Sequence, residues 1–331
     1  MPEPLTPPQA SKSDGSPRTI GVELEFGGLT CAHAAAVVAR QLGGTVREID
    51  RYRFVVDGTA LGAIRVELDT QFVHPGETTD PEQRVALERE RMGDLLEGAL
   101  RTAIGEVTAL YLPVELVVPP VPVASLPELD ALLPALREAG ARDTGASPIY
   151  GFGLQLNIDP PDLDPATLQA LMRAYAISGA HLRREIGVDW TRRLLPFVEP
   201  WPRAYLRALL AEETAPALSA LIDTYLTHNA TRNRDLDLLP LFLWLDPSRV
   251  RAAVSDPRLQ PRPAMHYRLP DSRLEDPAWS VTGEWNRWVT HVERLAADSE
   301  RLRAAGADYL DRLRGDRLSD WADQVAAWLG L

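Results

Sequence analysis

The stretch Thr19-Ile20-Gly21-Val22-Glu23-Leu24-Glu25-Phe26-Gly27 decides how this chain folds. Apolar and acidic residues alternate in it with a period of two, which is the period of a β-strand. Its apolar side chains are predicted to face one side, and Glu23 and Glu25 the other, about 6 to 7 Å apart along the strand. Two carboxylates this close repel unless a cation or a proton lies between them. The pair therefore predicts either a Mg²⁺ or Mn²⁺ site or an amphipathic strand with a solvated face.

The same alternation returns in residues 63–70, where Glu67 and Asp69 share one face and the apolar residues share the other. A third predicted strand, residues 113–120, carries the single acid Glu115 in an otherwise apolar run. Glu115 is either an edge residue or a ligand. A solvated face explains one strand with paired carboxylates more readily than two. The second such strand therefore favours a metal site.

Polar side chains also line two later predicted strands. In residues 149–159 Gln155 and Asn157 alternate with apolar residues, and amides on a strand are disfavoured without a partner. Facing a site, they would bind metal-bound water or nucleotide oxygens. In residues 262–270 a strand face of Arg262, His266 and Arg268 would complement phosphate; a half-exposed edge strand is the alternative.

A polar loop precedes the apolar helix that begins near residue 238. Its density of amide, hydroxyl and guanidinium groups suits a capping loop or a ligand loop equally well. The candidate residues in it are Asn229, Thr231, Arg232 and Asn233.

Composition narrows the class of protein. The chain has 331 residues, of which 45% are hydrophobic, so it is long enough for a large core. The net charge of −12 argues against broad nucleic-acid binding. Cys31 is the only cysteine, which excludes an intramolecular disulfide. With no signal segment and no apolar run of membrane-spanning length, we expect a cytoplasmic protein that does not bind a membrane.

Lysine usage excludes several enzyme classes. Lys12 is the only lysine, and it lies in the N-terminal tail. A P-loop, a protein kinase and a pyridoxal enzyme each need a lysine in the folded part. If this protein handles ATP, it must do so with metal ions and arginines.

The elements together predict an α+β fold. We expect a curved, largely antiparallel sheet of about five or six strands, with a wet concave face and helices on its outer face. The predicted organisation is a disordered leader over residues 1–17, a catalytic domain over 18–315 that includes a mainly helical segment at 164–259, and a C-terminal helix at 316–331.

The order of four motifs resembles the amidoligase family. They are Gly21-Val22-Glu23-Leu24-Glu25-Phe26, the later Val114-Glu115-Leu116-Val117-Val118-Pro119-Pro120, Gly153-Leu154-Gln155-Leu156-Asn157 and His266-Tyr267-Arg268. That family is similar to carboxylate–amine ligases with the glutamine synthetase and glutamate–cysteine ligase fold. The chain departs from it twice. Gln155 and Asn157 stand where the family has a His-x-His strand, and His266-Tyr267-Arg268 stands for a Glu-Phe-Arg strand.

The resemblance implies ATP-dependent joining of a carboxylate to an amine through an acyl phosphate, with ATP and Mg²⁺ or Mn²⁺ as cofactors. It implies that Glu23 and Glu25 bind metal and that Glu115 is a metal ligand or an amine-site residue, and His266 is a further candidate ligand. Glu67 and Asp69 would bind metal or bind and deprotonate the amine. Arg268 would stabilise the phosphoryl group in transfer, with Gln155, Asn157 and Arg262 near the nucleotide. The carboxylate substrate would be bound by Arg262 and by the polar loop residues Asn229, Thr231, Arg232 and Asn233.

Two other functions stay open at this level. One is a metal-dependent hydrolase that uses the same carboxylates. The other is a binding or regulatory relative that has lost turnover, which the two departures permit. The expected partners are small-molecule or peptide carboxylate and amine substrates, and no sequence feature decides for or against a homo-oligomer.

Overall fold

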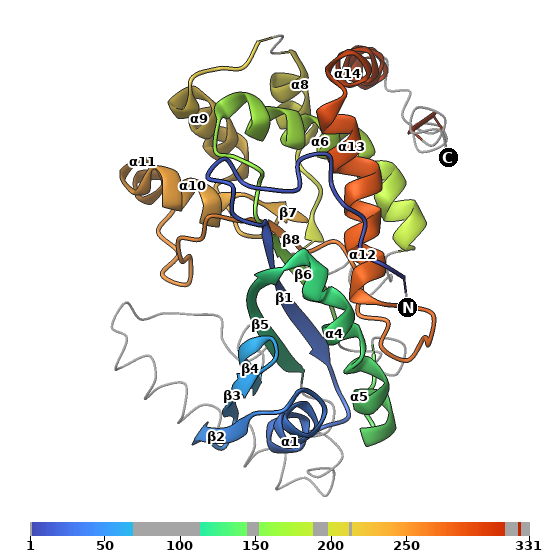
Figure 1. The fold of residues 1–331 in the computed structure, drawn as a ribbon. Helices are drawn as coiled ribbons and strands as arrows, with labels where there is room; N and C mark the ends of the chain where they lie inside the picture. Colours follow the sequence, from blue (N-terminus) through green and yellow to red (C-terminus); the bar gives the residue numbers. More distant parts are fainter. Residues whose placement is uncertain are drawn as a thin grey trace, which may run out of the picture.

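The computed structural model describes residues 2–68, 113–143, 152–187, 198–211, 214–314 and 324–325. Figure 1 shows an open sheet with helices beside it and a helical part at one end of the sheet. The described residues form an α+β protein, as the polar-faced strands and the helical segments predicted.

One eight-stranded sheet organises the described residues, in the order β2-β3-β4-β5-β1-β6-β8-β7. Every ladder in it is antiparallel. The opening stretch forms β1, which lies between β5 and β6 and is hydrogen-bonded to both. The strands are β1 (Thr19–Phe26), β2 (Thr45–Asp50), β3 (Arg53–Thr59), β4 (Gly62–Leu68), β5 (Val114–Pro122), β6 (Leu154–Ile158), β7 (Leu236–Asp237) and β8 (Met265–Tyr267).

The prediction of five or six strands was too low. The two-residue strand β7 is too short to show a period, and it lies within the segment at 164–259 that the sequence predicts to be mainly helical. It forms only because β8 offers it a partner, with Leu236 opposite Tyr267. A strand this short depends on tertiary pairing and leaves no signal in a sequence pattern.

Most helices of the described residues begin and end at residues typical of helix termini. Thr30 caps the first helix by accepting a hydrogen bond from the backbone N–H of His33. Residues 126–139 contain two short helices, and the described residues of the segment at 164–259 are mainly helical. The α-helices are α1 (Cys31–Leu42), α4 (Leu126–Asp130), α5 (Leu133–Ala139), α6 (Pro165–Ile186), α8 (Arg203–Ala211), α9 (Leu218–Asn229), α10 (Leu239–Leu245), α11 (Pro247–Ala253), α12 (Val281–Trp288), α13 (Arg294–Ala297) and α14 (Ser299–Arg314); the 3₁₀-helix η2 (Val123–Ser125) and the π-helix η5 (Val289–Glu293) complete them.

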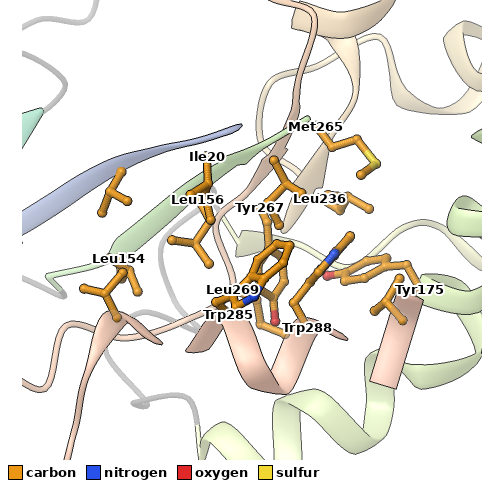
Figure 2. Close-up of a cluster of buried hydrophobic side chains, with 14 of the residues drawn as sticks. Ile20, Leu154, Leu156, Tyr175, Leu236, Met265, Tyr267, Leu269, Trp285 and Trp288 are labelled. Carbon is orange, nitrogen blue, oxygen red and sulfur yellow. The ribbon is translucent and has the colours of Figure 1, made fainter. Parts of the chain in front are cut away.

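The apolar side chains of β1 are fully buried on one face of the sheet. On that side Ile20 of β1 and Leu156 of β6 belong to a cluster with Trp285 and Trp288 of α12 (Figure 2). Burying large aromatic and aliphatic side chains is the main favourable term in such a fold. The helical layer therefore covers one face of the sheet, and the acidic residues of β1 point to the other.

The N-terminal segment differs from the prediction of a disordered leader. Residues 2–18 lie against the body of the protein and make specific hydrogen bonds to it. The indole Nε1 of Trp285 donates to the carbonyl of Leu5 at 2.9 Å, and the Leu5 N–H donates to Asn286 Oδ1 at 2.6 Å. Lys12 pairs with Asp159 at 2.9 Å. Proline-rich composition indicated a lack of regular structure, but these tertiary contacts fix the segment.

Other predicted features lie outside the described residues. Asp69 follows the last described residue of β4. Of the predicted C-terminal helix, only residues 324–325 are described. The first part of the strand predicted at 149–159 also lies outside them, and β6 begins at Leu154.

Gly28, two residues after the end of β1, gives a stability prediction. Its φ is +83°, and a Cβ atom there would lie 2.3 Å from the carbonyl oxygen of Gly140. Left-handed backbone costs a non-glycine residue roughly 1–2 kcal/mol, and overpacking adds about 1–3 kcal/mol. Gly28→Ala is therefore expected to lower the free energy of unfolding by about 2–5 kcal/mol, measured by urea denaturation.

Gly58 is the matched control for Gly28. Its φ is +77°, but no atom lies within 4 Å of a Cβ built there. Gly58→Ala should therefore show only the backbone cost, about 1–2 kcal/mol. Equal losses for the two variants would mean that Gly140 moves away at no cost, which would contradict the packing described here.

Candidate functional site

Three glutamates form a row across the polar face of the sheet. In the strand register Glu67 of β4 lies opposite Glu115 of β5, and Glu115 lies opposite Glu25 of β1. Residues directly opposite each other in antiparallel strands share a face, with Cβ atoms about 4.5–5.5 Å apart. Glu23, two residues before Glu25, lies on the same face. The structure thus brings Glu23, Glu25 and Glu115 to one surface, although they lie far apart in the chain.

Like charges directly opposite each other on a sheet are destabilising. Glu25 is 6% exposed, and hydrogen bonds hold its carboxylate in place: Gly153 N–H donates to Oε2 at 2.7 Å and Gln155 Nε2 donates to Oε1 at 2.8 Å. Glu67 and Glu115 are half-buried. This row offers only carboxylate oxygens, the donor set of hard divalent cations. The residues present therefore fit Mg²⁺ or Mn²⁺ better than a softer metal.

Glu23 has a different environment because it meets cationic and amide groups. Arg262 donates to its Oε1 at 2.8 Å, and Asn157 Nδ2 donates to the same oxygen at 3.0 Å. Burial opposes ionisation of Glu23, but its electrostatic interactions with His266 and Arg262 and these hydrogen bonds outweigh burial and lower the pKa of Glu23 to about 2. Glu23 is therefore a carboxylate at neutral pH.

His266 lies between the acidic and the basic parts of the face. Its Nε2 is 2.6 Å from Gln155 Oε1 and 4.0 Å from Glu23 Oε2. Burial, followed by repulsion from Arg268, lowers the pKa of His266 well below its usual value, despite the attraction of Glu23. The imidazole is therefore neutral near pH 7, and Arg262 supplies the lasting positive charge beside Glu23.

The β8 end of the polar face is basic. Arg268 is 3% exposed and lies 3.7 Å from the Asp237 carboxylate. Arg232, from the polar loop, is close enough to Arg268 for the two charges to interact; burial and then that repulsion lower the pKa of Arg232. The Nε of Arg232 is buried and has no hydrogen-bond partner in the protein. Two neighbouring guanidinium groups with an unused N–H form an environment that favours an anion.

The other residues of the polar loop have different surroundings. Both amide atoms of the fully buried Asn229 lack a hydrogen-bond partner. The hydroxyl of Thr231 accepts from the Asn233 N–H at 3.2 Å, which shapes the loop itself. Arg232 is thus the loop residue that the structure places near Arg268, and the predicted substrate-binding roles of Asn229, Thr231 and Asn233 stay predictions.

The sequence analysis missed two groups. Asp237 is fully buried opposite His266 in the register, and burial raises its pKa even though Arg268 and the Leu239 N–H oppose this. The Gly153 N–H holds Glu25, and a backbone group carries no sequence signal beyond the glycine itself. Asp237 had a weak signal, because Asp235 and Asp237 alternate with leucine.

A surface pocket elsewhere contains none of the predicted site residues. It lies between α9 and α11 and is lined by Asp223, Leu226, Thr227, Ser248, Arg249, Ala252 and Ala253. Its shallow, exposed lining includes no group that the sequence analysis singled out, so we place the candidate site on the polar face of the sheet.

Comparison with known proteins identifies the family of this chain. A family described as "putative amidoligase enzyme" matches residues 16–290, which span β1, β5, β6 and β8. The chain belongs to this amidoligase family. No curated protein and no solved structure matches it. Among the residues that the structure describes, no helix is long and apolar enough to cross a membrane.

The first departure from the family pattern, at Gln155 and Asn157, has a structural explanation in this protein. Gln155 joins two site residues, because its Nε2 donates to Glu25 while its Oε1 lies against His266 Nε2. Asn157 similarly donates to Glu23 and accepts from Arg262 at 3.2 Å. The two amides therefore orient carboxylates and the histidine, a role that neither contradicts nor tests their predicted contact with a nucleotide.

Proposed function

We propose that this protein is an ATP-dependent carboxylate–amine ligase with a fold like that of glutamine synthetase. The observation that supports this most is the separation of charge on a single sheet face. Glu67, Glu115 and Glu25 lie in register on one part of this face, and Arg262, Arg268 and Arg232 lie on the adjoining part, where Arg262 contacts Glu23. A nucleoside triphosphate with a divalent cation needs carboxylates for the cation and arginines for the phosphates, close together on one surface.

The glutamate row, together with Glu23 on the same face, would hold the cation. Glu25, Glu115 and Glu23 are the proposed ligands, and His266 is a weaker candidate because it lies against Gln155. Bound there, Mg²⁺ or Mn²⁺ would offset the negative charge of the phosphates. Gln155 and Asn157 keep Glu25 and Glu23 aligned, so little reorganisation is needed on binding.

The proposed reaction has two balanced steps. A carboxylate oxygen of the first substrate attacks the γ-phosphorus of ATP, the bond to the β–γ bridging oxygen breaks, and ADP leaves. The nitrogen of the second substrate then attacks the acyl carbon, the bond to phosphate oxygen breaks, and inorganic phosphate leaves. The amine loses one proton in this step.

Residues of the polar face suit these steps. Arg268 and Arg232 would bind the anionic oxygens of the phosphoryl group in transfer, and Arg262 would orient the substrate carboxylate. Glu67, at the half-buried end of the row, would accept the proton of the amine. Asp69 is proposed for the same task on the sequence pattern alone. The protein therefore needs no lysine for phosphoryl transfer.

Hydroxylamine provides a test that needs no knowledge of the natural amine. We expect Mg²⁺-dependent binding of ATP by calorimetry, and we expect ADP and an acyl hydroxamate to form when pooled amino acids, short peptides and hydroxylamine are supplied. Failure to bind ATP in the presence of Mg²⁺ would contradict the proposal. Amide hydrolysis without ATP would instead establish the metal-dependent hydrolase, and ATP binding without hydroxamate from any pool would favour a regulatory relative.

A further inference from the structure

Three metal-ligand side chains meet in the helical layer. His181 and Glu185 are one turn apart on α6, and a spacing of four residues places them on the same side of the helix. His291 comes from the π-helix η5. One ligand atom from each residue lies within 4.8 Å of the other two. The helix spacing brings two of the three together, and the third arrives only through tertiary packing.

The two imidazoles converge on a single carboxylate oxygen. His291 Nε2 lies 2.7 Å from Glu185 Oε2, and His181 Nε2 lies 3.3 Å from the same atom. The ring centroids are 4.9 Å apart. An ordinary ion pair needs one histidine, so the second imidazole directed at the same oxygen calls for a further explanation.

This cluster is separate from the candidate active site. On β8 the side chain of Tyr267 points away from His266 and Arg268, because neighbouring strand residues face opposite sides. Tyr267 packs against Tyr175 of α6 and Trp288 of α12, with ring centroids 5.9 and 5.0 Å apart (Figure 2). The helices that carry the cluster therefore cover the sheet face opposite the glutamate row.

We propose that His181, Glu185 and His291 form a Zn²⁺ site that joins α6 to η5. Two imidazoles and one carboxylate with an open fourth position form a donor set typical of zinc. With metal–ligand distances near 2.0–2.1 Å, donor atoms around a tetrahedral ion lie about 3.3–3.5 Å apart. The two distances to Glu185 Oε2 are 2.7 and 3.3 Å, and all three donor atoms lie within 4.8 Å of one another, so side-chain rotation can bring them to this spacing. The nitrogen donors disfavour Mg²⁺ and Ca²⁺, which prefer oxygen.

Neighbouring contacts hold these side chains in position. Arg287 Nε donates to Glu185 Oε1 at 2.9 Å, which directs Oε2 toward the imidazoles, and Arg287 also pairs with Glu284. The Ser178 hydroxyl donates to the His291 carbonyl at 2.9 Å and fixes the wide π turn against α6. Single π turns within α-helices occur frequently at functional sites. Outer hydrogen bonds of this kind orient metal ligands.

The exposure of the three side chains gives an ion a route to the site. The Glu185 side chain is 37% exposed, whereas those of His181 and His291 are 10% and 3% exposed. An ion can therefore approach past Glu185 while the imidazoles stay protected from solvent. Water would occupy the fourth position on that open side.

The test is Zn²⁺ titration of full-length protein stripped of metal with a chelator, followed by calorimetry and thermal unfolding. Excess Mg²⁺ is kept present so that the glutamate row does not take up zinc. We expect one Zn²⁺ per chain and a higher unfolding temperature, since a ligand that binds only the folded state stabilises it. Loss of an outer hydrogen-bond partner already weakens metal affinity about 10–100-fold, so loss of a ligand should weaken it at least about 100-fold.

Glu185→Gln is the main variant because its side chain is the most exposed of the three and its loss least disturbs packing. His181→Ala is the second, and His33→Ala on the exposed side of α1 is the control. Undiminished zinc binding in Glu185→Gln and His181→Ala, or no zinc binding by the folded wild type, would overturn the proposal. Neither outcome depends on ATP, so the result is independent of the ligase proposal.

Discussion

Glu115→Gln is expected to lower the rate of ADP formation by about 100- to 1,000-fold, the effect of removing one group that stabilises charge in a transition state. Glu115 is the middle member of the row, opposite both Glu67 and Glu25. The substitution keeps the size of the side chain and removes its charge. The measurement is the steady-state rate of ADP release with Mg²⁺, together with ATP affinity by calorimetry.

Glu48→Gln is the matched control for Glu115→Gln. Glu48 lies on β2 of the same sheet and is exposed to solvent. This variant should retain the activity and the ATP affinity of the wild type. If Glu115→Gln keeps full activity and Mg²⁺-dependent ATP binding, the glutamate row is not the nucleotide site. This conclusion does not depend on the family assignment.

The second large effect is expected at the buried ion pair of Arg18 and Glu293. Both side chains are almost fully buried, and Arg18 contacts both carboxylate oxygens, at 2.6 and 3.1 Å. Arg18 also donates to the carbonyl of Asp159 at 2.7 Å. The pair connects the start of β1 to η5. Arg18→Met would leave a carboxylate buried without its cation and is expected to cost about 3–5 kcal/mol in free energy of unfolding.

Two further variants make the Arg18 prediction specific. Because an apolar replacement of both partners removes the unpaired charge, Arg18→Met combined with Glu293→Met should recover much of the loss. Arg47→Met removes a solvent-exposed pair with Asp57 and should change stability by less than about 1 kcal/mol. Urea denaturation measures all three. A loss for Arg18→Met no larger than that for Arg47→Met would show that water reaches Glu293.

The elements with a clear period were predictable because that information is local. Alternation in residues 19–27 placed Glu23 and Glu25 on one face, and the structure keeps them there. The helix α6 at Pro165–Ile186 lies within the segment that was predicted to be mainly helical. By contrast, the two-residue β7 and the ordered N-terminal segment depend on partners distant in sequence, such as Tyr267 and Trp285.

The sequence by itself determined which side chains share a face within each strand and helix, because backbone geometry repeats every two or 3.6 residues. It also carried enough of the family pattern for the amidoligase assignment. Only the tertiary structure decided that Glu67, Glu115 and Glu25 stand in one row, since strand order and register arise from packing. The same holds for His291, which reaches His181 and Glu185 across more than a hundred residues of chain because α6 and η5 pack together.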